Sequence, residues 1–171
     1  TGYTDLWNFR TNTNSYGWYF GSQGYTVEGS HPSYDWFYNR RNVNGYLGIP
    51  TYYFLENRYS ELSPVTIAPD SILFQDIYNL YAANRDGAGG PYFSFNVTYQ
   101  GHGPYDPEEV WRGDHYTDGR YSTETANIVD NYLGSVADAA EQLAVLVDRL
   151  RQEERPVVLV VFGDHKPWLG Y

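Results

Sequence analysis

The chain has 171 residues, of which 42% are hydrophobic and 19% charged, a composition that excludes a disordered chain and suits one domain with its own core. The formal net charge of -10 disfavours nucleic-acid binding through a broad basic face, and the absence of cysteine excludes disulfides, thiolate metal sites and a cysteine nucleophile. The 19 tyrosines fit either a wet, ligand-lined surface or an extracellular domain.

Membrane spans and a signal peptide are not visible in the sequence. No apolar run approaches the roughly 20 residues that cross a bilayer, and the first residues lack a basic start and an apolar core. Because the sequence also begins without Met, we expect a soluble piece of a larger protein.

The first half of the chain predicts short elements. A helix is expected over 14–22, a strand near 25–29, and a turn with a short helix over 34–47. Gly48 follows this helix as a C-cap signal, and a short strand is expected over 52–55.

Longer elements follow. Pro69-Asp70 opens a helix that continues to about Asn84, because proline suits the first turn of a helix. Residues 91–99 alternate in polarity and are rich in strand formers, so they predict a strand, followed by a polar loop over 100–122.

The last third predicts a long helix and a final strand. The helix runs from about Thr123 to Gln152 and is expected to bend at Gly134. The strand covers 157–162, and its unbroken apolar run predicts a central strand covered on both faces. Alternating strands and helices indicate an α/β layered sheet. The apolar stripe expected to face the core from the long helix comprises Leu133, Val136, Ala140, Leu143, Val147 and Leu150.

Three histidines stand just past predicted strand ends. They are His31, His102 and His165, the last preceded by Asp164. One such histidine is more often an ordinary loop residue, but the carboxyl ends of parallel strands meet at one edge of a sheet. The shared placement therefore predicts that the three converge on one site.

Asp164 and His165 together suit a metal ion. A carboxylate oxygen beside an imidazole nitrogen fits Mn²⁺ or Zn²⁺, although two ligands need further partners. His115, in the second Gly-Asp-His triplet, has no strand before it, so we expect it in a solvated loop.

The stretch after the first strand mixes aromatic rings with a cation. Trp36, Phe37 and Tyr38 precede Arg40, and an Arg guanidinium binds phosphate or sulfate with two parallel hydrogen bonds. The alternative interpretation makes Trp36 and Phe37 core anchors and Arg40 a surface charge.

Four blocks of this sequence together resemble the extracellular catalytic domain of lipoteichoic acid synthases, which are sulfatase-like enzymes of the alkaline phosphatase superfamily. The similarity runs from about Tyr16 to Tyr171 and implies a truncated, mostly parallel sheet flanked by helices. The blocks read SQGYTVEGSH, FYNR, PYFSFNVTYQGHGPY and VVLVVFGDHKP.

The resemblance implies a manganese-dependent phosphoglycerol transferase at the extracellular face of the bacterial cell membrane. In that family a Thr nucleophile attacks phosphatidylglycerol and passes glycerophosphate to a growing polymer. By position, Asp164 and His165 resemble metal ligands, whereas the residues that resemble head-group ligands are His31, Arg40 and His102, with Tyr38 where the family has Trp.

The family pattern also implies missing parts. Its nucleophilic Thr and a metal-binding Glu would lie upstream of Thr1, as would its membrane helices, and the end of its catalytic domain would follow the last block. We therefore expect residues 1–171 to be a single-domain internal fragment, inactive in isolation and with weak or no metal binding.

Two other functions stay open. One is another enzyme of the same fold, a sulfatase, phosphoethanolamine transferase or phosphodiesterase, and the upstream nucleophile would distinguish these from the phosphoglycerol branch that the FYNR block favours. The other is a tyrosine-rich extracellular module that binds glycans without chemistry.

Overall fold

The structure is a computed structural model that describes residues 13–113, 115–116 and 118–170. By compactness the chain divides into two units, Thr1–Tyr99 and Gln100–Tyr171. Each unit is described by itself.

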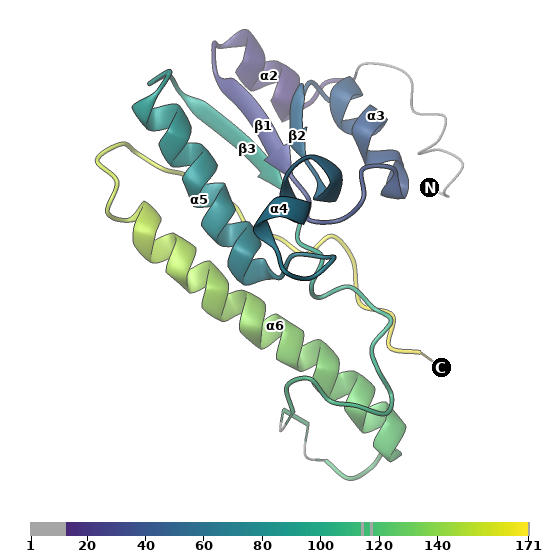
Figure 1. Cartoon of the computed structure of the whole chain (residues 1–171). Coiled ribbons are helices and arrows are strands. Elements are labelled where there is room, and N and C mark those ends of the chain that lie inside the picture. Colours follow the sequence, from purple (N-terminus) through teal and green to yellow (C-terminus); the bar gives the residue numbers. More distant parts are fainter. Residues whose placement is uncertain (1–12, 114, 117, 171) are drawn as a thin grey trace. The chain divides into compact units, whose positions relative to one another are not determined.

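The first unit is built on a three-stranded parallel sheet (Figure 1). Its strand order is β2-β1-β3, with β1 (Thr26–Ser30) between β2 (Thr51–Tyr53) and β3 (Tyr92–Asn96). The predicted strands near 25–29, 52–55 and 91–99 are confirmed, with β3 ending three residues early. The parallel arrangement brings the carboxyl ends of all three strands to one edge.

One face of the sheet packs against α2 (Tyr16–Ser22), the predicted first helix. Val27 lies in this core with partly buried Phe20 and Phe93, whose ring centroids are 4.8 Å apart. Because successive strand residues point to opposite faces, Phe93 faces α2 while Tyr92 faces the other way.

The opposite face packs against α5 (Asp70–Asp86), which Figure 1 shows running alongside β3. Tyr81 of α5 contacts Tyr92 with ring centroids 6.1 Å apart. A second core cluster, centred on buried Tyr59 and Leu73, lies on this side. The unit thus has helices on both faces of a parallel sheet, which confirms the predicted α/β fold class.

Short helical segments connect these elements. A 3-10 turn over Phe37–Asn39 leads into α3 (Arg40–Tyr46), and a π-helical turn over Leu55–Tyr59 leads into α4 (Ser60–Leu62). Gly48 has φ 75°, and a Cβ there would overlap Trp18 of α2. This left-handed glycine, just past α3, fits the helix C-cap that the sequence predicted at Gly48.

The second unit contains the long predicted helix α6 (Thr123–Leu150), capped by the Ser122 side chain. The helix continues without interruption through Gly134, and Figure 1 shows α6 as a straight helix, so the predicted bend is wrong. A Cβ at Gly134 would collide with the backbone of Arg112. Glycine is needed here because the preceding loop approaches the helix closely.

The buried face of α6 differs from the predicted apolar stripe. Val136 is 46% exposed, and Ala140 is exposed as well. The remaining stripe residues are only partly buried, whereas the buried residues of α6 are Asp130, Asn131, Gly134, Ser135 and Leu146. The first half of α6 buries polar side chains because they hydrogen-bond the backbone of the loop before it.

The predicted central strand over 157–162 is not a strand in this structure. Residues 157–162 are all exposed, with Val158 at 88%. A strand forms its hydrogen bonds with a neighbour, and no described strand pairs with this segment. The apolar run alone does not form a strand, and none of the described residues pairs with it.

No helix in the described ranges is both long enough and apolar enough to cross a membrane.

Candidate functional site

His31 lies directly past the end of β1 and is fully buried. Its backbone N–H donates to the carbonyl of Tyr53 at 2.8 Å, which extends the pairing of β1 with β2 by one residue. The imidazole Nδ1 lies 3.0 Å from the carbonyl oxygen of Val97. Since a carbonyl only accepts, Nδ1 carries a proton and donates it to the Val97 oxygen.

The segment before Arg40 has an unusual backbone. Tyr38 and Asn39 have φ values of 55° and 54°, in the left-handed region that L-residues adopt at a cost of about 1–2 kcal/mol each. Asn39 is buried, and its Oδ1 accepts from Asn42 Nδ2 at 2.8 Å. The turn places the Arg40 guanidinium over the Tyr38 ring, 5.6 Å from its centroid.

Arg40 forms no ion pair with any described residue. Neighbouring Arg41 pairs with Asp35, and Arg58 pairs with Asp76 at 2.5 Å. The Nε of Arg40 is buried, and the described part of the chain gives it no hydrogen-bond partner. A partly buried cation without a counter-charge is costly, so Arg40 has the properties of an anion-binding residue.

The positive charge of Arg40 also acts on the hydroxyl of Tyr52 in β2. Burial raises the pKa of the Tyr52 hydroxyl, and the positive charge of Arg40 partly opposes that rise. The hydroxyl therefore stays protonated and cannot serve as a counter-charge.

A continuous set of ring contacts joins His31 to Arg40. The ring of Tyr99 lies edge-on to His31 at 5.7 Å and contacts Phe37 at 6.2 Å. Phe37 in turn contacts Tyr38 at 4.5 Å. We call these five residues the rim cluster. The structure thus links His31, Tyr38 and Arg40, the three predicted substrate-binding residues of the first unit.

Tyr99 and the Val97 carbonyl were not singled out from the sequence. The signal for both is the strand register, which pairs Ser30 with Asn96. Residues just past β3 therefore lie beside His31, just past β1. That register depends on which strands are neighbours, which the sequence alone does not state.

His102, Asp164 and His165 lie in the second unit. His102 is exposed in the loop after β3, and its Nδ1 contacts the Gly103 carbonyl. Asp164 and His165 are also exposed, with Oδ2 and Nε2 3.6 Å apart. The His165 backbone N–H donates to Asp164 Oδ1 at 2.9 Å.

The Asp164–His165 pair fits two positions around a divalent metal. It offers one carboxylate oxygen and one imidazole nitrogen, close enough to reach one ion. No group of three His, Asp or Glu side chains suited to a metal occurs among the described residues. Further ligands would come from residues outside that description.

The second Gly-Asp-His triplet lies in a loop. His115 is exposed, and its backbone N–H donates to Asp130 Oδ1 at 3.1 Å. Asp114 lies outside the described residues, as does Thr1. The structure gives His115 the loop position that the sequence predicted.

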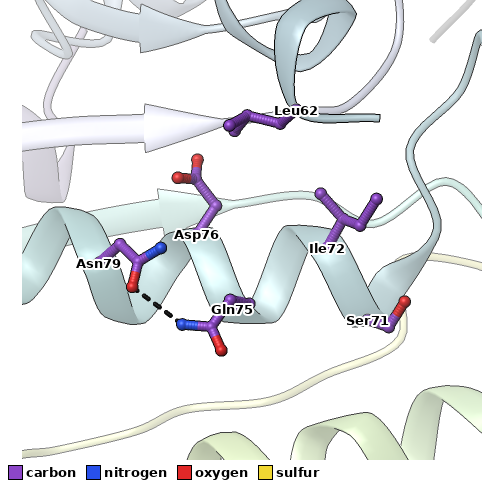
Figure 2. A pocket seen from close by; sticks show the side chains of 6 residues that line it. All are labelled: Leu62, Ser71, Ile72, Gln75, Asp76 and Asn79. Carbon is purple, nitrogen blue, oxygen red and sulfur yellow. Dashed lines mark hydrogen bonds between the residues drawn. The ribbon is translucent and has the colours of Figure 1, made fainter. Parts of the chain in front are cut away.

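A pocket of about 250 Å³ lies beside α5 (Figure 2). Asp76 lines it, but its carboxylate accepts two hydrogen bonds from Arg58, whose pKa is raised chiefly by that bonding. Gln75 donates to Asn79 across one helical turn at 2.8 Å. These polar groups are mutually satisfied, and no predicted site residue lines the pocket, which is bounded by Leu62, Ser71, Ile72, Gln75, Asp76 and Asn79.

Residues 2–171 match the sulfatase family, nearly the full length of the chain. The chain belongs to this family. This sulfatase-family chain is also 29% identical over 152 residues to a Rhizobium meliloti (strain 1021) protein named for cyclic beta-1,2-glucan modification. The match covers 89% of the chain and 23% of that relative.

Two solved structures share the fold. The lipoteichoic acid synthase LtaP from Listeria monocytogenes matches with a TM-score of 0.61 and 19% identity, covering 77% of this chain and 31% of LtaP. The Streptococcus pyogenes phosphoglycerol transferase GacH, solved with sn-glycerol-1-phosphate, matches with a TM-score of 0.58 and 18% identity, covering 78% and 34%. The chain therefore spans about a third or less of each relative.

Proposed function

We propose that the protein containing this chain transfers phosphoglycerol from phosphatidylglycerol to a cell-envelope polymer. The observation that carries the proposal is Arg40, a partly buried guanidinium with no ion pair among the described residues, linked to buried His31 through the rim cluster. Membership of the sulfatase family and the fold shared with LtaP and GacH support the same reaction class.

The rim cluster would hold the phosphoryl group. Arg40 would donate paired hydrogen bonds to two phosphoryl oxygens, and the Tyr38 ring beneath it would restrict its orientation. His31, fixed by its Nδ1 contact to Val97, would hold a proton at Nε2 and stabilise developing negative charge. His102 would add a further donor.

Asp164 and His165 would hold a divalent metal, which we propose to be Mn²⁺. Such an ion would supply Lewis-acid polarisation of a phosphoryl oxygen. Asp164 would provide a carboxylate oxygen, and His165 would keep its side-chain orientation through the Nδ1 contact with the Lys166 carbonyl at 2.8 Å.

Two relatives suggest the acceptor of the reaction, and the donor lipid suggests its location. One relative is named for modification of a cyclic glucan and another is a lipoteichoic acid synthase, so we propose a polymeric acceptor of the cell envelope. Phosphatidylglycerol is a membrane lipid, so the reaction would take place at a membrane surface, and we propose the extracellular face of the bacterial cell membrane.

A sulfatase or another hydrolase of the same fold is the second candidate. The family to which the chain belongs supports it, and an unpaired Arg binds sulfate as readily as phosphate. The donor that is turned over distinguishes the two candidates.

The test uses the whole protein with Mn²⁺ and either phosphatidylglycerol or an aryl sulfate. We expect glycerophosphate transfer, and we expect Arg40→Ala to lower kcat/KM roughly 10- to 100-fold because one charge-assisted contact is lost. Arg41→Ala is the matched control, since Arg41 is 71% exposed and already pairs with Asp35. Sulfate release without glycerophosphate transfer would favour the second candidate. Equal losses of kcat/KM in both variants would show that Arg40 is not part of the site.

A further inference from the structure

The side chain of Trp36 is exposed, and in sequence this residue directly precedes Phe37 of the rim cluster. It is 57% exposed, so the interpretation of Trp36 as a core anchor is wrong. Full burial of such a ring would contribute a few kcal/mol, and this position forgoes most of that gain. Single exposed apolar residues are common, so the argument depends on how the ring is held and what it adjoins.

Neighbouring rings hold Trp36 in place. Tyr34 stacks on it with centroids 5.4 Å apart and planes 27° apart, while Phe37 meets it edge-on at 5.9 Å. A ring held on two sides loses little freedom when a ligand binds, so less affinity is spent on ordering it. Trp36 therefore offers a pre-arranged aromatic surface.

This surface is continuous with the rim cluster. Phe37, which contacts Trp36, also contacts Tyr38 and Tyr99. Trp36 therefore directly contacts Phe37, one of the residues that link Arg40 to His31. A ring stacked on Trp36 would therefore lie beside an anionic group held at Arg40.

We propose that Trp36 binds the acceptor of the transfer reaction by stacking against a sugar ring of a neutral glycan. This inference rests on the proposed function. The C–H bonds on the flat side of a pyranose carry slight positive charge, which complements the negative face of an indole. Trp36 thus determines acceptor binding, whereas Arg40 and His31 determine donor binding.

The surrounding charge favours a neutral glycan over an anionic lipid surface. The chain has a formal net charge of -10, and Arg41, the nearby exposed cation, is neutralised by Asp35. Membrane surfaces of anionic lipid attract clusters of unpaired Lys and Arg. The segment around Trp36 has only Arg40 unpaired among its described cations.

The test separates donor and acceptor steps in the whole protein. Glycerophosphate release to water is measured without acceptor, and transfer is measured with a neutral β-glucan oligosaccharide. We expect Trp36→Ala to raise the KM for the glucan about tenfold, comparable to loss of one stacked ring, and to leave release to water within about twofold. Trp36→Tyr should restore most of the affinity, because an aromatic face is kept.

Calorimetric titration of the same glucan provides a readout that does not depend on turnover. Trp111→Ala is the control, since Trp111 is 60% exposed in the second unit and should leave glucan affinity unchanged. Equal glucan affinity in wild type and Trp36→Ala would overturn the inference. So would weakened binding of Trp36→Ala to phosphatidylglycerol vesicles at unchanged glucan affinity, which would assign the residue to a lipid surface. A wild type that binds glucan but turns over no donor would contradict the proposed function alone.

Discussion

Gly29 lies in the middle of β1, where Tyr52 of β2 and Phe95 of β3 are its register partners. A Cβ on this residue would overlap both the Tyr52 ring and the Phe95 carbonyl oxygen. The carbonyl belongs to a paired strand, so it cannot move away without breaking ladder hydrogen bonds. The close spacing of the three strands therefore depends on this glycine.

Gly29→Ala should lower the free energy of unfolding by about 1–3 kcal/mol, because overpacking displaces both neighbours. Urea unfolding followed by circular dichroism measures this change. Gly45→Ala is the control, because Gly45 lies inside α3 and a Cβ there would meet no other atom within 4 Å. That substitution should raise the free energy of unfolding by about 0.5–1 kcal/mol, since alanine favours a helix. A stable Gly29→Ala variant would contradict the described register.

At the scale of elements, α6 anchors the loop before it through two side chains. Asn131 Nδ2 donates to the carbonyls of Asp106 and Glu109 at 2.9 and 2.7 Å, and its Oδ1 accepts from the Trp111 backbone at 2.8 Å. Asp130 Oδ1 accepts from the backbone of Tyr116 at 2.7 Å. These bonds fix the loop along the first half of the helix.

Asn131→Ala should release this loop, because three backbone groups lose their partner at a cost of roughly 1–3 kcal/mol. Hydrogen exchange of the backbone amide of Trp111 should accelerate, while amides in the second half of α6 keep their protection. Asp148→Ala is the control, since Asp148 is exposed and its carboxylate lies 3.8 Å from the Arg151 guanidinium. Unchanged exchange at Trp111 would show that the side chain of Asn131 does not hold the loop.

Periodicity and capping signals predicted most elements of the fold. α5 and α6 follow from their apolar spacing and first-turn residues, and β1 and β3 from their strand formers. The buried side of α6 could not be predicted, because Asn131 and Asp130 are buried by hydrogen bonds to a loop rather than by apolar contact. Hydrophobic spacing contains no information about such bonds.

The site was predictable in position but not in detail. A histidine directly after a strand predicted the edge location of His31, and residue type suggested Arg40 as a candidate anion ligand. The ring contacts through Tyr99 depend on strand order, and Arg40 lacks an ion pair among the described residues because Asp35 pairs with Arg41 instead. The sequence alone does not show which residues are neighbours in space.

At the scale of the whole molecule, buried tyrosines make the folded state less stable at alkaline pH. Burial raises the pKa values of Tyr52, Tyr59 and Tyr92 above the ordinary value of 10.0. For Tyr92, the nearby Glu28 carboxylate adds to the rise and accepts a hydrogen bond from the Tyr92 hydroxyl at 3.1 Å. The folded state therefore favours the protonated phenols.

The sign of this effect follows from the raised pKa values. Their contribution to stability is complete below about pH 10, the unfolded value, and is lost as pH rises towards the folded values. We expect the unfolding midpoint in urea to fall steadily above pH 10, and tyrosinate absorbance of these residues to appear together with unfolding. Full tyrosine ionisation at unchanged circular dichroism would contradict this expectation.

The exposed apolar segment over 157–162 should cause copies of the isolated chain to associate with one another. Val158 and Val160 are 88% and 73% exposed, and an extended apolar segment with open backbone groups pairs readily with other chains. The double substitution Val158→Lys and Val160→Lys should reduce self-association measured by sedimentation velocity. Val65→Lys, at an exposed site in the other unit, should not. A strictly monomeric wild-type chain would contradict the exposure of this segment.

The central claim is that Arg40 and the rim cluster bind the phosphoglycerol group. Its most direct test is calorimetric titration of sn-glycerol-1-phosphate into the whole protein and into its Arg40→Ala and Arg41→Ala variants. We predict saturable binding by the wild type and Arg41→Ala, and affinity at least about tenfold weaker for Arg40→Ala. Equal affinity in all three proteins, or no binding by the wild type, would contradict the account.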